Sequence, residues 1–225
     1  MNVFLFIVGI ILTFTALVLV NKFLGSEGVI AFMAVASILA NILICKSITL
    51  FGMSATLGNI LFASNFLATD ILTECYGVKK ARKGVIVALC SVLGFLVVSQ
   101  FALWAIPNEF DIAQPAFETL FTLAPRITIA SVSLFVLSNI ADISLYEFLR
   151  KKTDGKKMWL RNNLCTIICN GSENFIFYVI AFLGVFAFKE IVFMAITATI
   201  IEIIVALCDT PFLYLAKKFA LKSDN

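Results

Sequence analysis

The chain has 225 residues, of which 61% are hydrophobic and 14% are charged, and its mean hydropathy is +1.04. A soluble domain is nearer half apolar and a quarter charged, so this composition excludes a water-soluble globular protein and makes the lipid bilayer the solvent. The net charge of +3 is too small to indicate a nucleic-acid partner.

Seven stretches of the chain are long and apolar enough to form membrane-spanning helices. A span needs about 20 mostly apolar residues to cross the hydrocarbon core. In chain order, the candidate spans are 3–23, 28–46, 55–76, 84–106, 124–149, 162–185 and 190–216. No long linker separates them, so the sequence predicts a single transmembrane helical domain over residues 1–225, an all-α polytopic helix bundle.

The first and third predicted spans have special features. The first carries no charge before Lys22 and lacks the basic start of a secretory signal peptide, so we expect a membrane span. The third carries Gly58 and Asn65 within its range and follows Gly52. A broken or partly re-entrant helix is therefore an alternative for that span.

Basic residues between the spans predict the orientation. Residues 77–83 carry four Lys or Arg, residues 150–161 carry six, and the C-terminal tail continues this pattern with three more Lys after residue 216. Residues 107–119 carry three acids and no Lys or Arg. Because cytoplasmic loops are enriched in Lys and Arg, we expect a cytoplasmic C-terminus and an external acidic loop. Seven spans then place the N-terminus outside.

Several function classes lack the residues they need. The chain has six Cys and no His, so the commonest general base and metal ligand is absent. The Cys spacing matches neither a disulfide framework nor a CxxC metal knuckle, and neither a GxSxG elbow nor a GxxxxGKS or GxxxxGKT loop occurs. We therefore predict that the protein is not an enzyme and binds no metal, cofactor or ATP by itself.

The third predicted span carries two acids and an amide. Asp70 and Glu74 are four residues apart and share a helix face, and Asn65 precedes them in the same apolar run. Ionisable groups inside a span usually face the bundle interior and serve function. The alternative is that the acids pair with Lys79 or Arg82 of the next basic segment and anchor the end of the helix.

The fifth and sixth predicted spans repeat one pattern, an amide followed three residues later by an acid. The two pairs are Asn139 with Asp142 and Asn170 with Glu173. An amide beside a carboxylate presents hydrogen-bond donors and acceptors in one patch, which suits a flat heterocycle with several hydrogen-bonding edges. The alternative is bonding between helices without a substrate, worth about 0.6 kcal/mol per bond on average.

Two further polar segments have structural explanations. Residues 161–163, Arg-Asn-Asn, lie at a predicted helix start, where an Asn cap is sufficient. Residues 209–211, Asp-Thr-Pro, predict a kink, because proline removes a helical hydrogen bond.

Four segments of the chain resemble a known family. "LATDILTECYGVKKAR", "PRITIASVSLFVLSNIADISLYEFLRK", "WLRNNLCTIICNGSENFIFYVIAF" and "EIIVALCDTPFLYLAKK" are similar to the queuosine precursor transporters, a vitamin-uptake-like family. The resemblance runs from about Asn41 to Lys218. Its most specific stretch is T-D-I-L-T-E-x-Y-G followed by basic residues.

The resemblance implies a fold and a function that composition and spacing do not. Family members import 7-deazaguanine precursors of the tRNA nucleoside queuosine across bacterial or archaeal inner membranes. Their fold is similar to the substrate-binding components of energy-coupling-factor transporters, a six-span core to which 3–23 would add an N-terminal span. An energy-coupling partner module, an ion gradient and intracellular trapping stay open as driving forces, and so does a homo-oligomer.

Together with the polar pattern, the resemblance marks the candidate substrate-binding residues. They are Asn65, Asp70, Glu74, Arg126, Asn139, Asp142, Asn170 and Glu173. The expected small-molecule ligand is a deazapurine, whose N–H edge suits a carboxylate, whose carbonyl suits an amide and whose ring suits an aromatic such as Tyr146. The expected environment is the lipid bilayer, and no nucleic acid is expected to bind.

Three positions depart from the family pattern. Glu173 stands where Asp is usual, so a carboxylate is retained with a longer reach. Asn139 stands where Gln is frequent, and Glu202 stands where a basic residue is frequent, so no family role is carried over to Glu202. The alternatives for function are a transporter of another vitamin-like molecule and an accessory membrane subunit that transports nothing.

Overall fold

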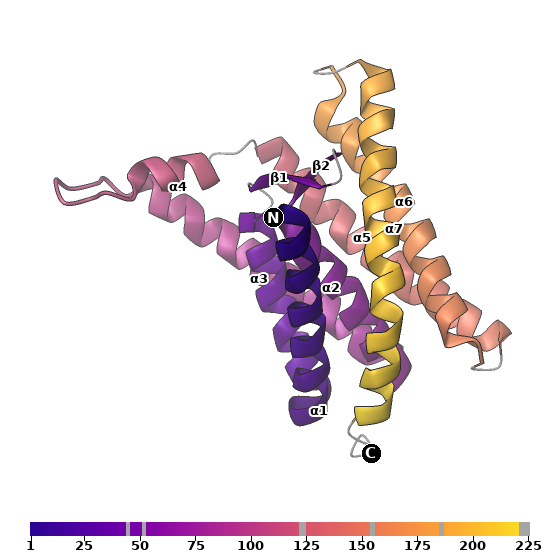
Figure 1. The fold of residues 1–225 in the computed structure, drawn as a ribbon. Coiled ribbons are helices and arrows are strands. Elements are labelled where there is room, and N and C mark those ends of the chain that lie inside the picture. The colour runs from indigo at the N-terminus through magenta and orange to yellow at the C-terminus, as the bar shows by residue number, and fades with distance from the viewer. Residues whose placement is uncertain (44–45, 51–52, 122–124, 154–155, 185–186, 221–225) are drawn as a thin grey trace.

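The protein folds as a bundle of long helices with a short β-hairpin (Figure 1). The computed structural model describes residues 1–43, 46–50, 53–121, 125–153, 156–184 and 187–220, and for some residues inside these ranges only the backbone. The elements in chain order are α1 (Asn2–Leu43), β1 (Ser47–Leu50), β2 (Met53–Thr56), α2 (Gly58–Ile71), the π-helix η1 (Leu72–Tyr76), α3 (Val78–Trp104), α4 (Gln114–Phe121), α5 (Pro125–Lys152), α6 (Met158–Phe182) and α7 (Phe188–Phe219). The helical class predicted from the sequence is confirmed.

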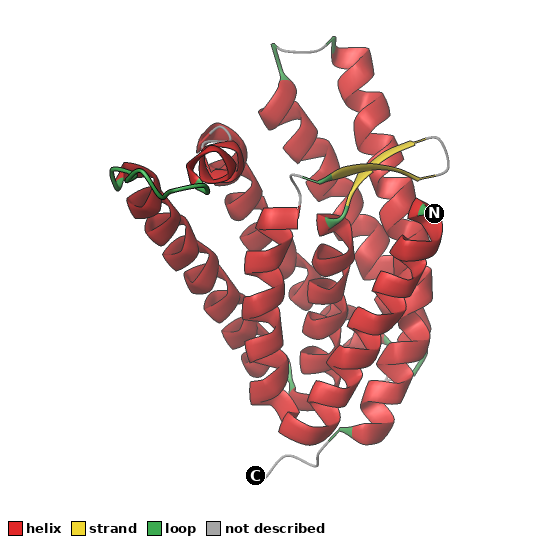
Figure 2. Ribbon diagram, turned by 60° about the vertical axis from the view of Figure 1, so that its left-hand side comes forward, coloured by secondary structure: helices red, strands yellow, loops and turns green. Residues whose placement is uncertain are grey.

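The helix α1 contains the first two predicted spans, joined at Gly25. This residue has φ 60° and ψ −151° and interrupts the helical backbone. The N-terminus and β1 lie at the same end of the bundle in both views (Figures 1 and 2), so the chain reverses direction at Gly25. The element is therefore a helical hairpin, and its second half ends at Leu43 rather than at residue 46.

Replacing Gly25 with Ala should destabilise the protein by about 1–3 kcal/mol, because its φ and ψ lie in a region that side chains disfavour. Gly94→Ala is the matched control, since a Cβ added at Gly94 in α3 meets nothing within 4 Å, and alanine favours a helix over glycine. Thermal unfolding in detergent measures both. If Gly25→Ala unfolds no earlier than Gly94→Ala, the reversal at residue 25 is wrong.

The β-hairpin between α1 and α2 was not predicted. Its two strands pair antiparallel with the register Ser47↔Thr56, Ile48↔Ala55, Thr49↔Ser54 and Leu50↔Met53. Four pairs between long helices give a weak sequence signal, and Gly52 and Gly58 favoured a broken helix instead. The hairpin occupies the end of the bundle opposite the C-terminus (Figure 2).

The irregularity expected in the third span lies at its other end. The helix α2 continues into η1, and π-helical turns are found frequently at functional sites. The chain then reverses at Gly77, whose φ of 86° suits glycine. The predicted loop 77–83 is wrong beyond this residue, because α3 begins at Val78 and carries the basic residues in its first turns.

Helices α5 and α7 extend past the C-terminal ends predicted for them. The basic residues Arg150–Lys152 form the last turn of α5, and Lys217 and Lys218 lie in the last turn of α7. The acidic segment 107–119 contains the start of α4. Within α7 the parts Ile191–Ile204 and Cys208–Phe219 are bent by 41°, just before Pro211, which agrees with the predicted proline kink.

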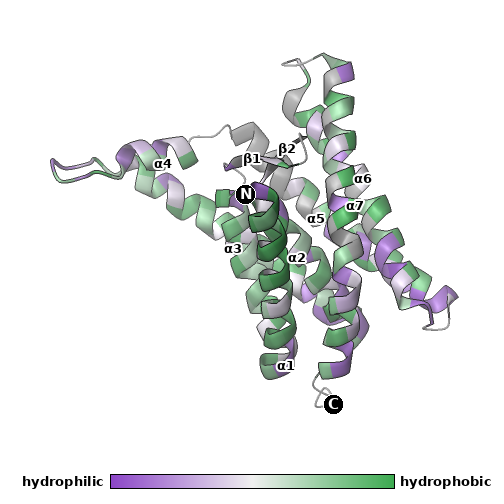
Figure 3. Cartoon of the chain, viewed as in Figure 1, coloured by the Kyte–Doolittle hydropathy of each residue, from purple (hydrophilic) through white to green (hydrophobic). Residues whose placement is uncertain are grey.

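Apolar side chains fill the core and also cover the outside. The core includes Phe14, Met33, Leu67, Ile143 and Leu213, all fully buried. Large apolar side chains on the outer faces of α1 and α3 are more than 40% exposed, and Figure 3 shows these helices as mostly hydrophobic. Apolar surface of this extent marks a membrane-facing protein.

Among the described residues, two helices are long and apolar enough to cross a membrane. These are Asn2–Leu43, which the reversal at Gly25 divides, and Val78–Trp104, and the bent pair in α7 would make a third. The predicted number of seven spans stays a prediction.

Candidate functional site

Helices that are distant in the sequence meet at the end of the bundle that carries the C-terminus. Asn21 of α1 donates to the carbonyl of Ala216 at 3.0 Å and accepts from the hydroxyl of Tyr76 at 2.9 Å. Lys80 of α3 forms an ion pair of 2.5 Å with Glu27. We call this the basic end, because the three basic segments of the sequence all contribute to it.

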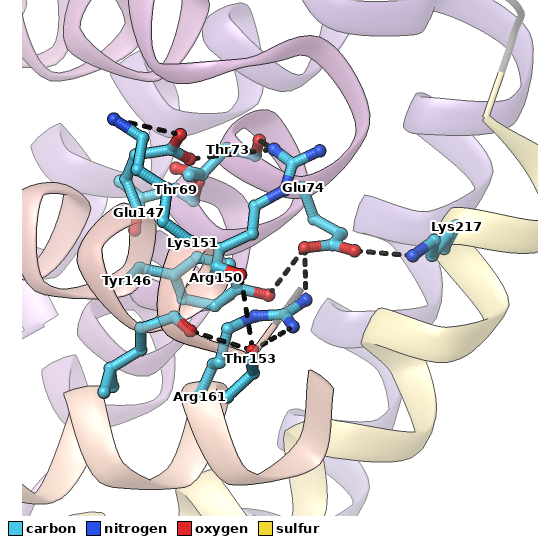
Figure 4. A network of polar contacts seen from close by, with 11 residues as sticks. Thr69, Thr73, Glu74, Tyr146, Glu147, Arg150, Lys151, Thr153, Arg161 and Lys217 are labelled. Carbon is cyan, nitrogen blue, oxygen red and sulfur yellow. Dashed lines mark hydrogen bonds and ion pairs between the residues drawn. The ribbon is translucent and has the colours of Figure 1, made fainter. Parts of the chain in front are cut away.

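Glu74 is the centre of a polar network at the basic end. From η1 it accepts hydrogen bonds from Arg161 of α6 at 2.7 Å, Lys217 of α7 at 2.5 Å and the Tyr146 hydroxyl of α5 at 3.3 Å (Figure 4). We call these four residues the Glu74 network. The Glu74 side chain is 2% exposed and that of Lys217 is 49% exposed, so the network extends from the surface into the interior of the bundle.

Arg161 is the largest fully buried side chain of the described residues. Besides Glu74, it donates from Nη1 to the carbonyl of Lys156 at 2.6 Å and to the Thr153 hydroxyl at 3.3 Å. Its guanidinium lies 5.4 Å from the centre of the Tyr146 ring. Its Nε has no hydrogen-bond partner among the described atoms.

Three aspartates lie next to this network, deeper in the bundle. Asp70 of α2, Asp142 of α5 and Asp209 of α7 are each 2% exposed, and Asp70 interacts electrostatically with both others, with Glu74 and with Arg161. We call them the Asp cluster. Asp209 accepts from Asn162 at 2.6 Å, whereas no hydrogen bond or ion pair of Asp70 is found among the described contacts.

Further from the basic end, amides and acids surround Asp142. The hydroxyl of Thr69 lies beside its carboxyl group, and Glu173 of α6 interacts with it electrostatically. Asn139, one turn before Asp142, is fully buried. Asn65, one turn before Thr69, is also fully buried, and it donates to Ser37 at 3.1 Å while its Oδ1 has no described hydrogen-bond partner.

The structure thus divides the predicted residues. Glu173 interacts with Asp142, Asn139 lies one turn before Asp142 on α5, and Asn65 lies one turn before Thr69 on α2. Asp70 belongs to the Asp cluster and Glu74 to the Glu74 network. The side chains of Arg126 and Asn170 lie outside the described part of the structure. Glu202 pairs instead with Asn174 at 2.7 Å.

Two structural explanations from the sequence change. Glu74 is ion-paired, as the anchoring alternative expects, but with Arg161 and Lys217 rather than with Lys79 or Arg82. The Asn cap predicted for 161–163 is wrong, because α6 begins at Met158 and these residues lie inside the helix. Asn162 and Asn163 bond to Asp209 and Thr210 of α7.

The sequence did not predict Arg161, Asn162, Asp209 and Lys217 as members of a site. Arg161 was counted with the basic loop because the apolar span starts after it. One signal was present: Arg161, Cys165 and Cys169 are spaced by four, and all three are buried on one face of α6. No group of three or more His, Cys, Asp or Glu side chains in the described ranges has the geometry of a metal site.

Apolar outer faces around a buried cluster of ionisable side chains define the class: a multi-pass membrane protein with an internal polar site. A family model described as "Putative vitamin uptake transporter" matches residues 56–216. The chain belongs to this family, so the resemblance seen in the sequence is confirmed.

Two relatives support the assignment. The chain is 34% identical over 209 residues to a "Probable queuosine precursor transporter" of Bacillus subtilis (strain 168), covering 92% of this chain and 91% of that protein. It is 27% identical over 137 residues to a protein of the same name from Haemophilus influenzae (strain Rd), covering 59% and 54%. Both names describe transporters, which agrees with the prediction of a non-enzyme. No solved structure matches the chain.

Proposed function

We propose that this protein is a transporter that imports a queuosine precursor, a 7-deazaguanine-type base, across the cytoplasmic membrane. The observation that carries the proposal is the match over nine-tenths of both chains to the Bacillus subtilis relative. The buried polar site supports it, because a transporter must satisfy the hydrogen bonds of a polar substrate inside the bilayer.

The residues around Asp142 suit such a base. A deazaguanine presents a ring carbonyl, an amidine-like N–H edge and an exocyclic amine. The N–H edge and the amine are hydrogen-bond donors, so the site must supply acceptors for them. The carboxyl groups of Asp142 and Glu173 are buried or half-buried acceptors that interact with each other, and Asn65, one turn before the Thr69 that lies beside Asp142, has a buried Oδ1 with no described hydrogen-bond partner. We assign substrate contact to these three residues and Asn139, and keep Arg126 and Asn170 as candidates from the sequence.

Asp70 and Glu74 belong below the substrate in this proposal. Glu74 has its charge balanced by Arg161 and Lys217 and ties η1 to α5, α6 and α7. These bonds lie at the basic end, which the positive-inside rule places in the cytoplasm together with the C-terminus. The Glu74 network therefore forms the cytoplasmic closure of the site.

The finer points of the architecture stay part of the proposal. The helices after the α1 hairpin's first half would form the six-span core shared with energy-coupling-factor substrate components, with residues 3–23 as an additional N-terminal span. A homo-oligomer and an energy-coupling module are compatible partners. Because the family description names vitamin uptake, another vitamin-like molecule is the second candidate substrate.

Cells that cannot make the precursor test the proposal. Supplied with it in the medium, they should form queuosine in tRNA only when this protein is present, because the polar base crosses a bilayer poorly by itself. Queuosine content of isolated tRNA is the measurement, and a strain with an empty vector is the control. Equal queuosine in both strains, with no second importer encoded, rejects the proposed substrate.

A further inference from the structure

The Asp cluster carries more negative charge than its described surroundings balance. Four carboxyl groups lie together here, those of Asp70, Asp142, Asp209 and Glu74. The two cations nearby, Arg161 and Lys217, both bind Glu74. None of the three aspartates therefore forms an ion pair with a cation in the described part of the structure.

Among the described side chains, the electrostatic neighbours of Asp70 and Asp142 on the other helices include no further cation, and Arg150 of α5 donates instead to the backbone carbonyl of Thr73. The described electrostatic neighbours of Asp70 and Asp142 from α5 and α6 include the uncharged groups Tyr146, Cys165 and Cys169 and a further acid, Glu173. From α1 and α3 no charged side chain is among the described neighbours of Asp70. Hydrogen bonding is also incomplete, because Asp70 is 2% exposed and its Oδ1 has no described partner.

Several ionised carboxylates so close together and so deeply buried are not stable. Burial disfavours the charged form, and each neighbouring negative charge disfavours it further. The described carboxyl groups of the cluster are each 2% exposed, so burial favours a bound proton on at least one of them. Once water reaches the cluster, the same carboxyl groups ionise, and the number of bound protons depends on which side of the membrane the cluster faces.

We propose that the Asp cluster carries protons during transport, with Asp70 as the main carrier, so that import is coupled to an inward proton gradient. The inference rests on the proposed transport function but adds its energy source. Facing outside, the carboxylate of Asp70 takes a proton from water and forms an O–H bond. When Asp70 faces the cytoplasm, that bond breaks and the proton passes to water. Each proton bound on the outside therefore enters the cell.

After substrate and proton have left, Arg161 allows the protein to close again while Asp70 is ionised. It interacts with Asp70 electrostatically, and its Nε is a buried donor without a described partner. When the Glu74 network opens, Glu74 keeps the surface cation Lys217 or meets water, and Arg161 is free to balance Asp70. Glu74 is not the carrier, because two cations already balance its charge.

Purified protein in liposomes tests the coupling with radiolabelled 7-deazaguanine. With the voltage clamped, an inward gradient of about one pH unit should raise its accumulation up to about tenfold if one proton accompanies each substrate. Adding substrate outside should acidify the lumen, followed with a trapped pH dye. Liposomes at equal pH on both sides and liposomes without protein are the controls.

The wild-type protein separates the two proposals. Uptake that occurs but ignores the gradient and moves no protons overturns the proton coupling and leaves the proposed transport function standing. No saturable uptake under any gradient rejects the proposed substrate instead.

Three variants assign the proton to the cluster. Asp70→Asn and Asp209→Asn should each reduce the ratio of accumulation with and without the gradient, since an amide cannot carry the proton. Glu202→Gln is the matched control, because it removes an acid elsewhere in α7 beside an amide partner, and its ratio should stay that of wild type. A wild-type ratio in Asp70→Asn overturns Asp70 as the main carrier. If that variant fails to insert, Asp209→Asn tests the cluster, and a wild-type ratio in it overturns the assignment of the proton to the cluster.

Discussion

Replacing Arg161 with Met should destabilise the protein by about 3–5 kcal/mol, the largest effect on folding that the structure predicts. The substitution removes the buried partner of Glu74, whose carboxylate is 2% exposed, and leaves only the half-exposed Lys217 as a cation. It also leaves the carbonyl of Lys156 without its donor. Thermal or denaturant unfolding in detergent measures the loss.

Two companion variants show whether this loss comes from an unbalanced buried charge. Adding Glu74→Met to Arg161→Met should recover much of the stability, because two apolar side chains replace a buried ion pair at little cost. Lys80→Met breaks an ion pair with Glu27 whose side chains are 40% and 60% exposed, so we expect a loss of at most about 1 kcal/mol. Equal losses from Lys80→Met and Arg161→Met would contradict the buried network.

Hydropathy predicted most helices, because a membrane-facing helix must be apolar along its length. It misplaced their ends at the basic end. Val78 and Met158 begin helices that carry basic residues in their first turns. In α3 long cationic side chains reach water from the helix, whereas in α6 Arg161 is buried in an ion pair with Glu74. Because charged residues were assigned to loops, the predicted helices begin later in the chain than α3 and α6 do.

Spacing along one helix predicted part of the site, and contacts between helices supplied the rest. Asp70 and Glu74 are close because they are four residues apart on one chain segment. The partner of Glu74 lies 87 residues away in Arg161, and the spacing of Arg161 with Cys165 and Cys169 marks a buried helix face without indicating which residue that face contacts. The same holds for Asn162 and Asp209, which lie 47 residues apart.

The different fates of Asp70 and Glu74 follow from this. The sequence placed both in one substrate-binding set, with anchoring as the alternative. In the structure, Glu74 has three donors from three helices, whereas Asp70 has no described hydrogen bond. Tertiary contacts thus distinguish Glu74, an acid held by three donors, from Asp70, an acid with no described hydrogen bond, within a single turn of helix.

Replacing Asp142 with Asn, or Glu173 with Gln, should reduce uptake of the precursor by roughly 10- to 100-fold. Each change replaces a carboxylate oxygen, which accepts hydrogen bonds, with an amide nitrogen, which donates them. A hydrogen bond to a charged group is worth about 1.5–3 kcal/mol. Shape and volume change little, so the amount of protein in the membrane should stay that of wild type. Uptake of radiolabelled 7-deazaguanine, normalised to membrane abundance, is the measurement.

Glu202→Gln is again the control, since Glu202 bonds to Asn174 and is not among the residues assigned to substrate contact, so its loss should leave uptake unchanged. The combined Asp142→Asn and Glu173→Gln variant tests whether the two acids serve one ligand. Their described electrostatic interaction means that their effects should not simply add. Wild-type uptake in both single variants would instead assign these acids to hydrogen bonding between α5 and α6, and the substrate site would have to lie elsewhere in the bundle.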